Sequence, residues 1–191
     1  GYGRHCPDLT DELPSDMNAT SLNIAAGHAH AGTPPGGAGS RPTEQVQTTR
    51  WGAVEIQLDT IITFPDGLIG LGGRRYALIS TDPGSPFQWL QSLDHPAVAL
   101  PVTNPHRFFK DFAVELEPAE IEQLGLENGE GADVLVTVTV SADASATTVN
   151  LKAPILIRAG LGYQVMNRRP GMLVKTPLLA SAAAGGAARA A

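Results

Sequence analysis

The chain has very little cysteine and few aromatic residues. Its only cysteine among 191 residues is Cys6, so one chain can form neither a disulfide framework nor a cysteine-based zinc site. Aromatic residues make up 5% of the chain, so a core must rest on Val, Ile and Leu. No apolar run of about 18 residues occurs, and the first residues lack the basic and apolar regions of a secretion signal. These absences predict a cytoplasmic protein with no membrane segment.

Positive charge is also scarce. Lys and Arg number 13 against 19 Asp and Glu, which gives a formal net charge of −6. Because contacts to phosphate groups need Lys and Arg, this balance argues against nucleic acid as a direct partner. An acidic protein is better suited to a basic protein partner.

The two ends of the chain carry little that could be buried. Residues 1–47 read as loop throughout, and the Gly, Ala, Pro, His and Ser of 25–42 cannot offset the entropy of ordering. Because the chain begins at Gly1 and Met17 is an alternative start, part of this tail is a candidate for non-native sequence. Residues 180–191 are Ala and Gly with one Ser and one Arg. We expect disordered tails at 1–47 and 180–191, around a domain at 48–179.

Within 48–179 the pattern is that of β-strands. Val54, Ile56 and Leu58 alternate with polar residues, as they do in a strand with one face in water. Further candidate strands are 61–64, 75–80, 87–91, 97–102, 134–140, 147–152, 155–157 and 163–166, with Gly, Pro, Asp and Asn turns between them. Many short strands of this kind predict an all-β, mainly antiparallel fold, a small closed or partly open barrel or roll.

One short helix is expected near residues 118–125. Pro118 suits a first helical position, and Ile121 and Leu124 are three residues apart. Gly125 can end the helix.

The first distinctive motif is Phe64-Pro65-Asp66-Gly67-Leu68-Ile69-Gly70. It reads as a strand followed by a tight turn, in which Pro65 presets φ and Gly67 can adopt a positive φ. Leu68 and Ile69 either pack inward and plug the end of a barrel or form an exposed apolar contact for a partner.

Two other segments join apolar residues to turn residues in the same way. Leu90-Gln91-Ser92 follows Pro86-Phe87-Gln88-Trp89, and its polar side chains either bond a backbone edge or contact a partner. The segment 148–155, Thr-Val-Asn-Leu-Lys-Ala-Pro-Ile, contains Asn150, Leu151, Ala153 and Pro154.

No constellation points to catalysis or to a cofactor. Ser92 lacks a glycine elbow and a nearby His–acid pair, and the histidines of the domain, His95 and His106, lack metal-ligand spacing. We therefore expect no enzyme, no metal and no cofactor. A carboxylate-based hydrolase and a small-ligand or carbohydrate-binding β domain remain as alternatives.

Acidic residues gather in one segment, 111–133, which contains eight acids and no Lys or Arg. They are Asp111, Glu115, Glu117, Glu120, Glu122, Glu127, Glu130 and Asp133. This segment is either a solvated face or a surface for a basic partner. Just before it, Phe108 and Phe109 follow a turn, and on a strand one of them would face outward as an interface anchor or pack beneath a loop.

Together these motifs resemble those of the FliW family of flagellar assembly factors, over about residues 48–178. The family pattern is approximately F-P-x-G-L-P-G-F, then L-Q-S, then P-x-x-F-F, then T-V-N-L-x-A-P-I and a strand with Gln. This chain has all five in order, with Ile69 and Leu71 where Pro and Phe are usual, and with Gln164 in the last strand.

The resemblance implies a protein–protein antagonist, and because no coiled-coil pattern appears in the sequence we expect a monomer. Such a protein binds the RNA-binding translational repressor CsrA, relieves repression of flagellin mRNA, and also binds flagellin as the alternative partner. The basic repressor suits the acidic character of this chain. The expected partner-binding residues are Glu115, Glu117, Glu120, Glu122, Phe108, Phe109 and Leu68. The residues expected to hold the fold are Phe64, Pro65, Gly67, Gly70, Leu90, Gln91, Asn150, Leu151, Ala153 and Pro154.

Overall fold

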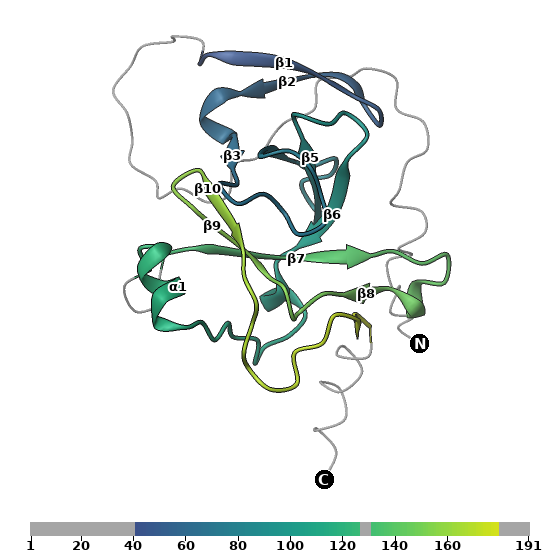
Figure 1. Ribbon diagram of the computed structural model, residues 1–191. Helices are drawn as coiled ribbons and strands as arrows, with labels where there is room; N and C mark the ends of the chain where they lie inside the picture. Colours follow the sequence, from purple (N-terminus) through teal and green to yellow (C-terminus); the bar gives the residue numbers. More distant parts are fainter. Residues whose placement is uncertain (1–40, 127–130, 180–191) are drawn as a thin grey trace.

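The computed structural model describes residues 41–126 and 131–179, and most of its regular structure is β-strand (Figure 1). The described residues include one α-helix, α1 (Pro118–Gln123). The strands are β1 (Thr43–Thr48), β2 (Gly52–Gln57), β3 (Ile62–Thr63), β4 (Arg75–Ile79), β5 (Phe87–Ser92), β6 (Ala99–Thr103), β7 (Asp133–Thr139), β8 (Thr148–Val149), β9 (Ile155–Arg158), β10 (Leu161–Gln164) and β11 (Thr176–Pro177).

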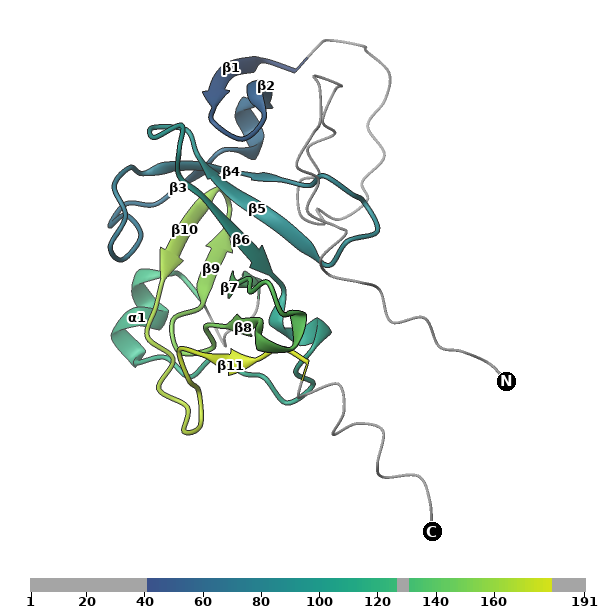
Figure 2. The same ribbon diagram turned by 90° about the vertical axis from the view of Figure 1, so that its right-hand side faces the viewer.

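Seven of these strands form a closed barrel in the order β7-β6-β5-β4-β3-β10-β9 (Figures 1 and 2). The barrel closes because β9 also pairs with the first half of β7, with Leu135 opposite Ile155. All neighbours are antiparallel except β10 and β3, which pair in parallel between Leu161 and Thr63. The expected all-β barrel with one short helix is thus confirmed, in its closed form.

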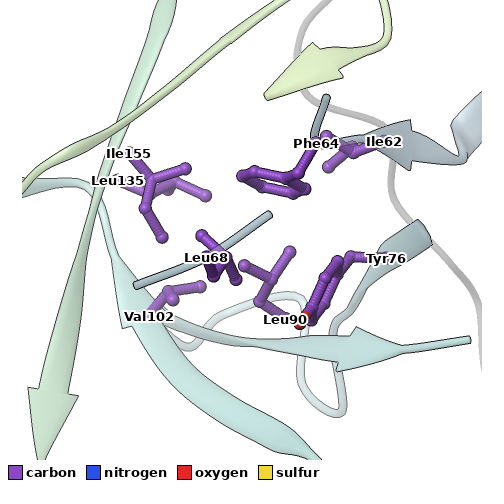
Figure 3. Packing of buried hydrophobic residues seen from close by; sticks show 8 residues of the cluster. All are labelled: Ile62, Phe64, Leu68, Tyr76, Leu90, Val102, Leu135 and Ile155. Carbon is purple, nitrogen blue, oxygen red and sulfur yellow. The ribbon is translucent and has the colours of Figure 1, made fainter. Parts of the chain in front are cut away.

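The barrel interior is filled by alternate residues of its strands. Figure 3 shows this cluster, which consists of Ile62, Phe64, Leu68, Tyr76, Leu90, Val102, Leu135 and Ile155. The rings of Phe64 and Tyr76 meet edge to face with their centroids 5.2 Å apart. Such aromatic contacts stabilise a core beyond the area that they bury.

A two-stranded ribbon of β1 and β2 covers the outside of the barrel. Val46, Val54 and Ile56 of the ribbon pack on Ala77 and Ile79 of β4, which are fully buried. An ion pair between Glu44 and Arg75 also joins β1 to β4. Figure 1 shows the ribbon at the top of the molecule.

A second outer layer lies against β7. The short strands β8 and β11 extend the sheet from the second half of β7. As a result β7 is buried on both faces: Leu135 faces the barrel, whereas Val136 and Val138 pack with Phe112, Val149, Leu151 and Leu178.

The helix α1 begins and ends as the sequence predicts. Pro118 occupies its first turn, and a capping box forms in which the Glu120 side chain accepts a hydrogen bond from Glu117 N at 2.8 Å. Gly125 follows with a φ of +60°, a conformation that glycine adopts without a Cβ clash. Ile121 and Leu124 pack toward Leu126, Leu156 and Val165.

Three expectations about the elements need correction. Residues 43–47, assigned to the N-terminal tail, belong to β1, because pairing with β2 orders a polar segment that has little apolar pattern of its own. The strand expected at 163–166 is β10 and begins at Leu161, and the strand expected at 147–152 is only β8. Residues 1–40 and 180–191 of the two predicted tails lie outside the described residues.

Candidate functional site

Residues 64–71, called the hook here, close one mouth of the barrel. Gly67 N donates to Phe64 O at 3.1 Å and Leu71 N donates to Leu68 O at 3.0 Å, so two tight turns follow each other. Leu68 lies in the barrel core (Figure 3). Its exposed fraction is 5%, whereas that of Ile69 is 67%. The turn thus directs Leu68 inward, as in the reading in which it plugs the end of the barrel, and directs its neighbour Ile69 outward.

The Leu90-Gln91-Ser92 motif is buried throughout and serves the fold. Leu90 lies in the barrel core. The Gln91 side chain donates from Nε2 to Ser92 O at 2.8 Å and to Pro96 O at 3.3 Å, and Ser92 Oγ accepts from His95 N at 3.1 Å. Of the two readings of the motif, backbone bonding is therefore the one that the geometry supports.

The loop after this motif binds the segment that leads from the hook into β4. The Asp94 carboxylate accepts hydrogen bonds from Arg74 N at 2.6 Å and Arg75 N at 3.0 Å. These backbone N–H groups, Arg74 first, hold the pKa of Asp94 below its ordinary value. The Tyr76 hydroxyl donates to Gly72 O at 2.9 Å, and burial raises the pKa of Tyr76.

Gln164 joins two motifs that are far apart in the sequence. Its Oε1 accepts from Ile69 N of the hook at 2.9 Å, and its Nε2 donates to Ala153 O at 3.4 Å. Ala153 N in turn donates to Asn150 Oδ1 at 3.0 Å. The hook, the Asn150 turn and the Gln of the last strand thus form one hydrogen-bonded unit at the barrel mouth.

The acidic residues of 111–126 lie on the other side of β10, on α1 and the chain that leads to it. Glu115, Glu117 and Glu122 are exposed, while Glu120 is half-buried and engaged in the capping box. Glu117 forms an ion pair with Arg168 at 2.7 Å, so a distant cation neutralises one of these acids. Glu115 and Glu122 form no ion pair with any residue that the structure describes. Glu127 and Glu130 lie outside the described residues.

Asn167 is the residue that sequence reasoning missed in this region. It is fully buried, donates from Nδ2 to Ala113 O at 2.9 Å, and accepts at Oδ1 from Glu115 N at 3.1 Å. It therefore fixes the chain that carries the acids, although 52 residues separate it from Glu115. A single Asn after a short strand has no spacing pattern that would reveal this role.

Phe108 and Phe109 are not on a strand. They follow a 3-10 turn, Pro105–Arg107, and both are half-buried against the cluster that contains Phe112. The ring of Phe108 stacks on Phe87 with centroids 5.8 Å apart. The alternation expected on a strand therefore does not apply, and both rings pack against the same cluster.

A groove with a volume of about 340 Å³ lies between the end of α1 and the β9–β10 hairpin. Leu126 and Leu156, 2% and 4% exposed, are its most buried lining residues, and Tyr163 and Leu161 also line it. Glu122 and Arg158 contribute charged side chains. We call this feature the α1 groove.

The described part of the chain offers neither a metal-binding cluster nor a membrane-spanning helix. No group of three or more His, Cys, Asp or Glu there has an arrangement that could hold a metal ion. Residues 41–126 and 131–179 also include no helix that is long and apolar enough to cross a membrane.

Known proteins match both the sequence and the fold. A relative from Natranaerobius thermophilus, described as flagellar assembly factor FliW, is 34% identical over 138 residues, which cover 70% of this chain and 91% of the relative. A protein of the same description from Nitratidesulfovibrio vulgaris is 42% identical over 130 residues, 66% of this chain and 75% of the relative.

The structural comparison agrees. The crystal structure of a flagellar assembly factor FliW superposes with a TM-score of 0.63 and 28% identity, and covers 71% of this chain and 96% of that one. The family model described as FliW protein matches residues 45–178, which span the barrel, the hook, the Asn150 turn and α1. The chain therefore belongs to the FliW family of flagellar assembly factors.

Proposed function

We propose that this chain acts by binding proteins in the cytoplasm: it binds a CsrA-type translational repressor and thereby relieves repression of flagellin mRNA. Flagellin is the second partner, and its binding releases the repressor. Two partners that compete for one protein shift each other's free concentrations, so the level of flagellin would control its own translation. Membership of the FliW family is the observation that carries this proposal.

The acidic surface around α1 supports a basic partner. Glu115 and Glu122 are exposed and form no ion pair within the described residues. Charges of this kind steer a basic protein toward its site and are screened by salt. We propose that Glu115, Glu117 and Glu122 form the electrostatic part of the interface. Glu117 also forms an ion pair with Arg168.

Glu120 has a second role that changes how the surface should be tested. Because its carboxylate caps α1, a reversal to Lys would remove a helix-capping interaction as well as a surface charge. Glu122→Lys changes the surface charge without this cost. It is therefore the sharper variant.

The test is calorimetric titration of the full chain with a purified CsrA-type repressor, alone and after saturation with flagellin, at low and high salt. We expect repressor binding that weakens with salt, is lost on addition of flagellin, and falls in Glu122→Lys. No binding of the repressor at either salt concentration would refute the proposal.

A further inference from the structure

We propose that the α1 groove is the anchor site of the interface, and that it takes one apolar side chain from a basic segment of the repressor. This inference rests on the proposed function. It goes further by assigning the contact to a groove beside α1, and not to the hook or to Phe108 and Phe109.

The shape of the groove suits a side chain. Its volume of about 340 Å³ falls at the lower end of the range for ligand-binding clefts. Leu126 and Leu156 give it buried apolar surface, and Leu161, 42% exposed, gives it surface that a partner can still cover. Interfaces concentrate their binding energy in apolar side chains that fill such central pockets.

The charges around the groove favour a basic segment. Glu122 lines the groove, and Glu115 and Asp133 are exposed on neighbouring segments. The one cation of the lining, Arg158, lies close to Gly125: its Nη1 is 3.4 Å from the position that a Cβ would occupy there. At the end of α1 a cation interacts favourably with the last helix carbonyls. Glu122, Glu115 and Asp133 outnumber this one cation, so the surface around the groove is acidic.

The groove is also built from fixed elements. The capping box and Gly125 set the two ends of α1, and Asn167 fixes the chain that enters it. The other wall is the hairpin of β9 and β10, whose strands pair directly on either side of a two-residue turn. A site that needs no reorganisation loses less free energy on binding than a flexible one.

The experiment measures repressor affinity for four variants of the full chain by calorimetry. Leu161→Ala removes an exposed wall of the groove, and Leu173→Ala is its control, since Leu173 is 58% exposed and does not line the groove. Glu122→Gln removes one charge of the groove, and Asp111→Asn removes one charge of the same acidic segment outside it.

We expect Leu161→Ala to weaken binding by about tenfold or more, and Leu173→Ala by less than about twofold. Glu122→Gln should lower affinity more than Asp111→Asn does. Repressor-induced protection from hydrogen exchange should fall on 121–126 and 156–163.

Two results would overturn the groove while leaving the proposed function intact. One is tight repressor binding that Leu161→Ala and Leu173→Ala change equally. The other is protection that falls on the hook and not on α1. A wild-type chain that does not bind the repressor would instead refute the proposed function itself, so the two failures are distinguishable.

Discussion

The hook and the α1 groove lie on the two faces of the same strand, β10, and differ in the burial and the bonding of their residues. Gly162 faces the barrel core and contacts Phe64 of the hook, whereas its neighbours Leu161 and Tyr163 line the groove. At the hook, Phe64 and Leu68 are buried in the barrel core and Ile69 N is hydrogen-bonded to Gln164, although the Ile69 side chain is exposed. At the groove, side chains are partly exposed, and Glu122 has no ionic partner among the described residues.

The segments that are easiest to recognise in the sequence are therefore not the ones best suited to bind a partner. The hook, the Leu90-Gln91-Ser92 strand and the Asn150 turn carry the sequence motifs, yet the hydrogen bonds there join side chains to backbone atoms of the fold. The groove has no motif, but it offers uncovered apolar area and unpaired charge, which are what an interface needs. We therefore expect changes at the hook to alter stability, and changes at the groove to alter binding.

The largest effect is expected for Gly162→Ala. A Cβ at this position would lie 2.5 Å from Phe64 Cζ and 2.8 Å from Ile62 Cγ2, inside the packed barrel. Because over-packing forces side chains off their rotamers, we expect a loss of about 3 kcal/mol in the free energy of unfolding, measured in urea. Gly84→Ala is the control, since its Cβ would make only an ordinary contact at 3.4 Å to Asp82. Equal stability of the two variants would mean that the hook end is not tightly packed.

A smaller, pH-dependent effect is expected for Asp94→Asn. The folded-state pKa of Asp94 is lowered by the N–H groups of Arg74 and Arg75, so its carboxylate stabilises the fold at neutral pH. This contribution is complete above the unfolded carboxyl pKa of about 4 and is lost as pH falls through the lower folded value. Because Asp94 is exposed, we expect the variant to lose only about 0.5 to 1 kcal/mol at pH 7.

Melting temperatures of wild type and Asp94→Asn between about pH 2 and 7 would check this. The two curves should be separated near neutrality and converge in acid. If the two melting temperatures differ by the same amount at every pH, the Asp94 charge does not stabilise the segment between the hook and β4.

The sequence predicted much of the barrel because its strands alternate and are bounded by turns. The expected strands at 75–80, 87–91 and 134–140 correspond to β4, β5 and β7. It could not predict β1, whose order depends on pairing with β2. Nor could it decide which of Leu68 and Ile69 faces inward, since that depends on the exact turn between them.

The candidate site was predicted only in its charge. The acidic run pointed to α1, but the groove depends on residues from β9 and β10 that approach only after the barrel closes. The ion pair of Glu117 could not be predicted, because its partner, Arg168, is far along the chain. Long-range packing of this kind leaves no local pattern in a sequence.

The smallest effect is expected at Ala159, in the turn between β9 and β10 at the groove. Ala159 has a φ of +49°, the only positive φ outside glycine among the described residues, and Gly160 follows at +77°. Two consecutive positive φ values suit a two-residue hairpin turn with Asn-Gly, and alanine is strained there. We expect Ala159→Asn to raise the free energy of unfolding by about 0.5 kcal/mol. Ala159→Gly should change it little, because relief of strain is offset by greater entropy of the unfolded chain. Urea unfolding of both variants would test this, and a loss of stability in Ala159→Asn would show that the groove hairpin is less regular than its backbone indicates.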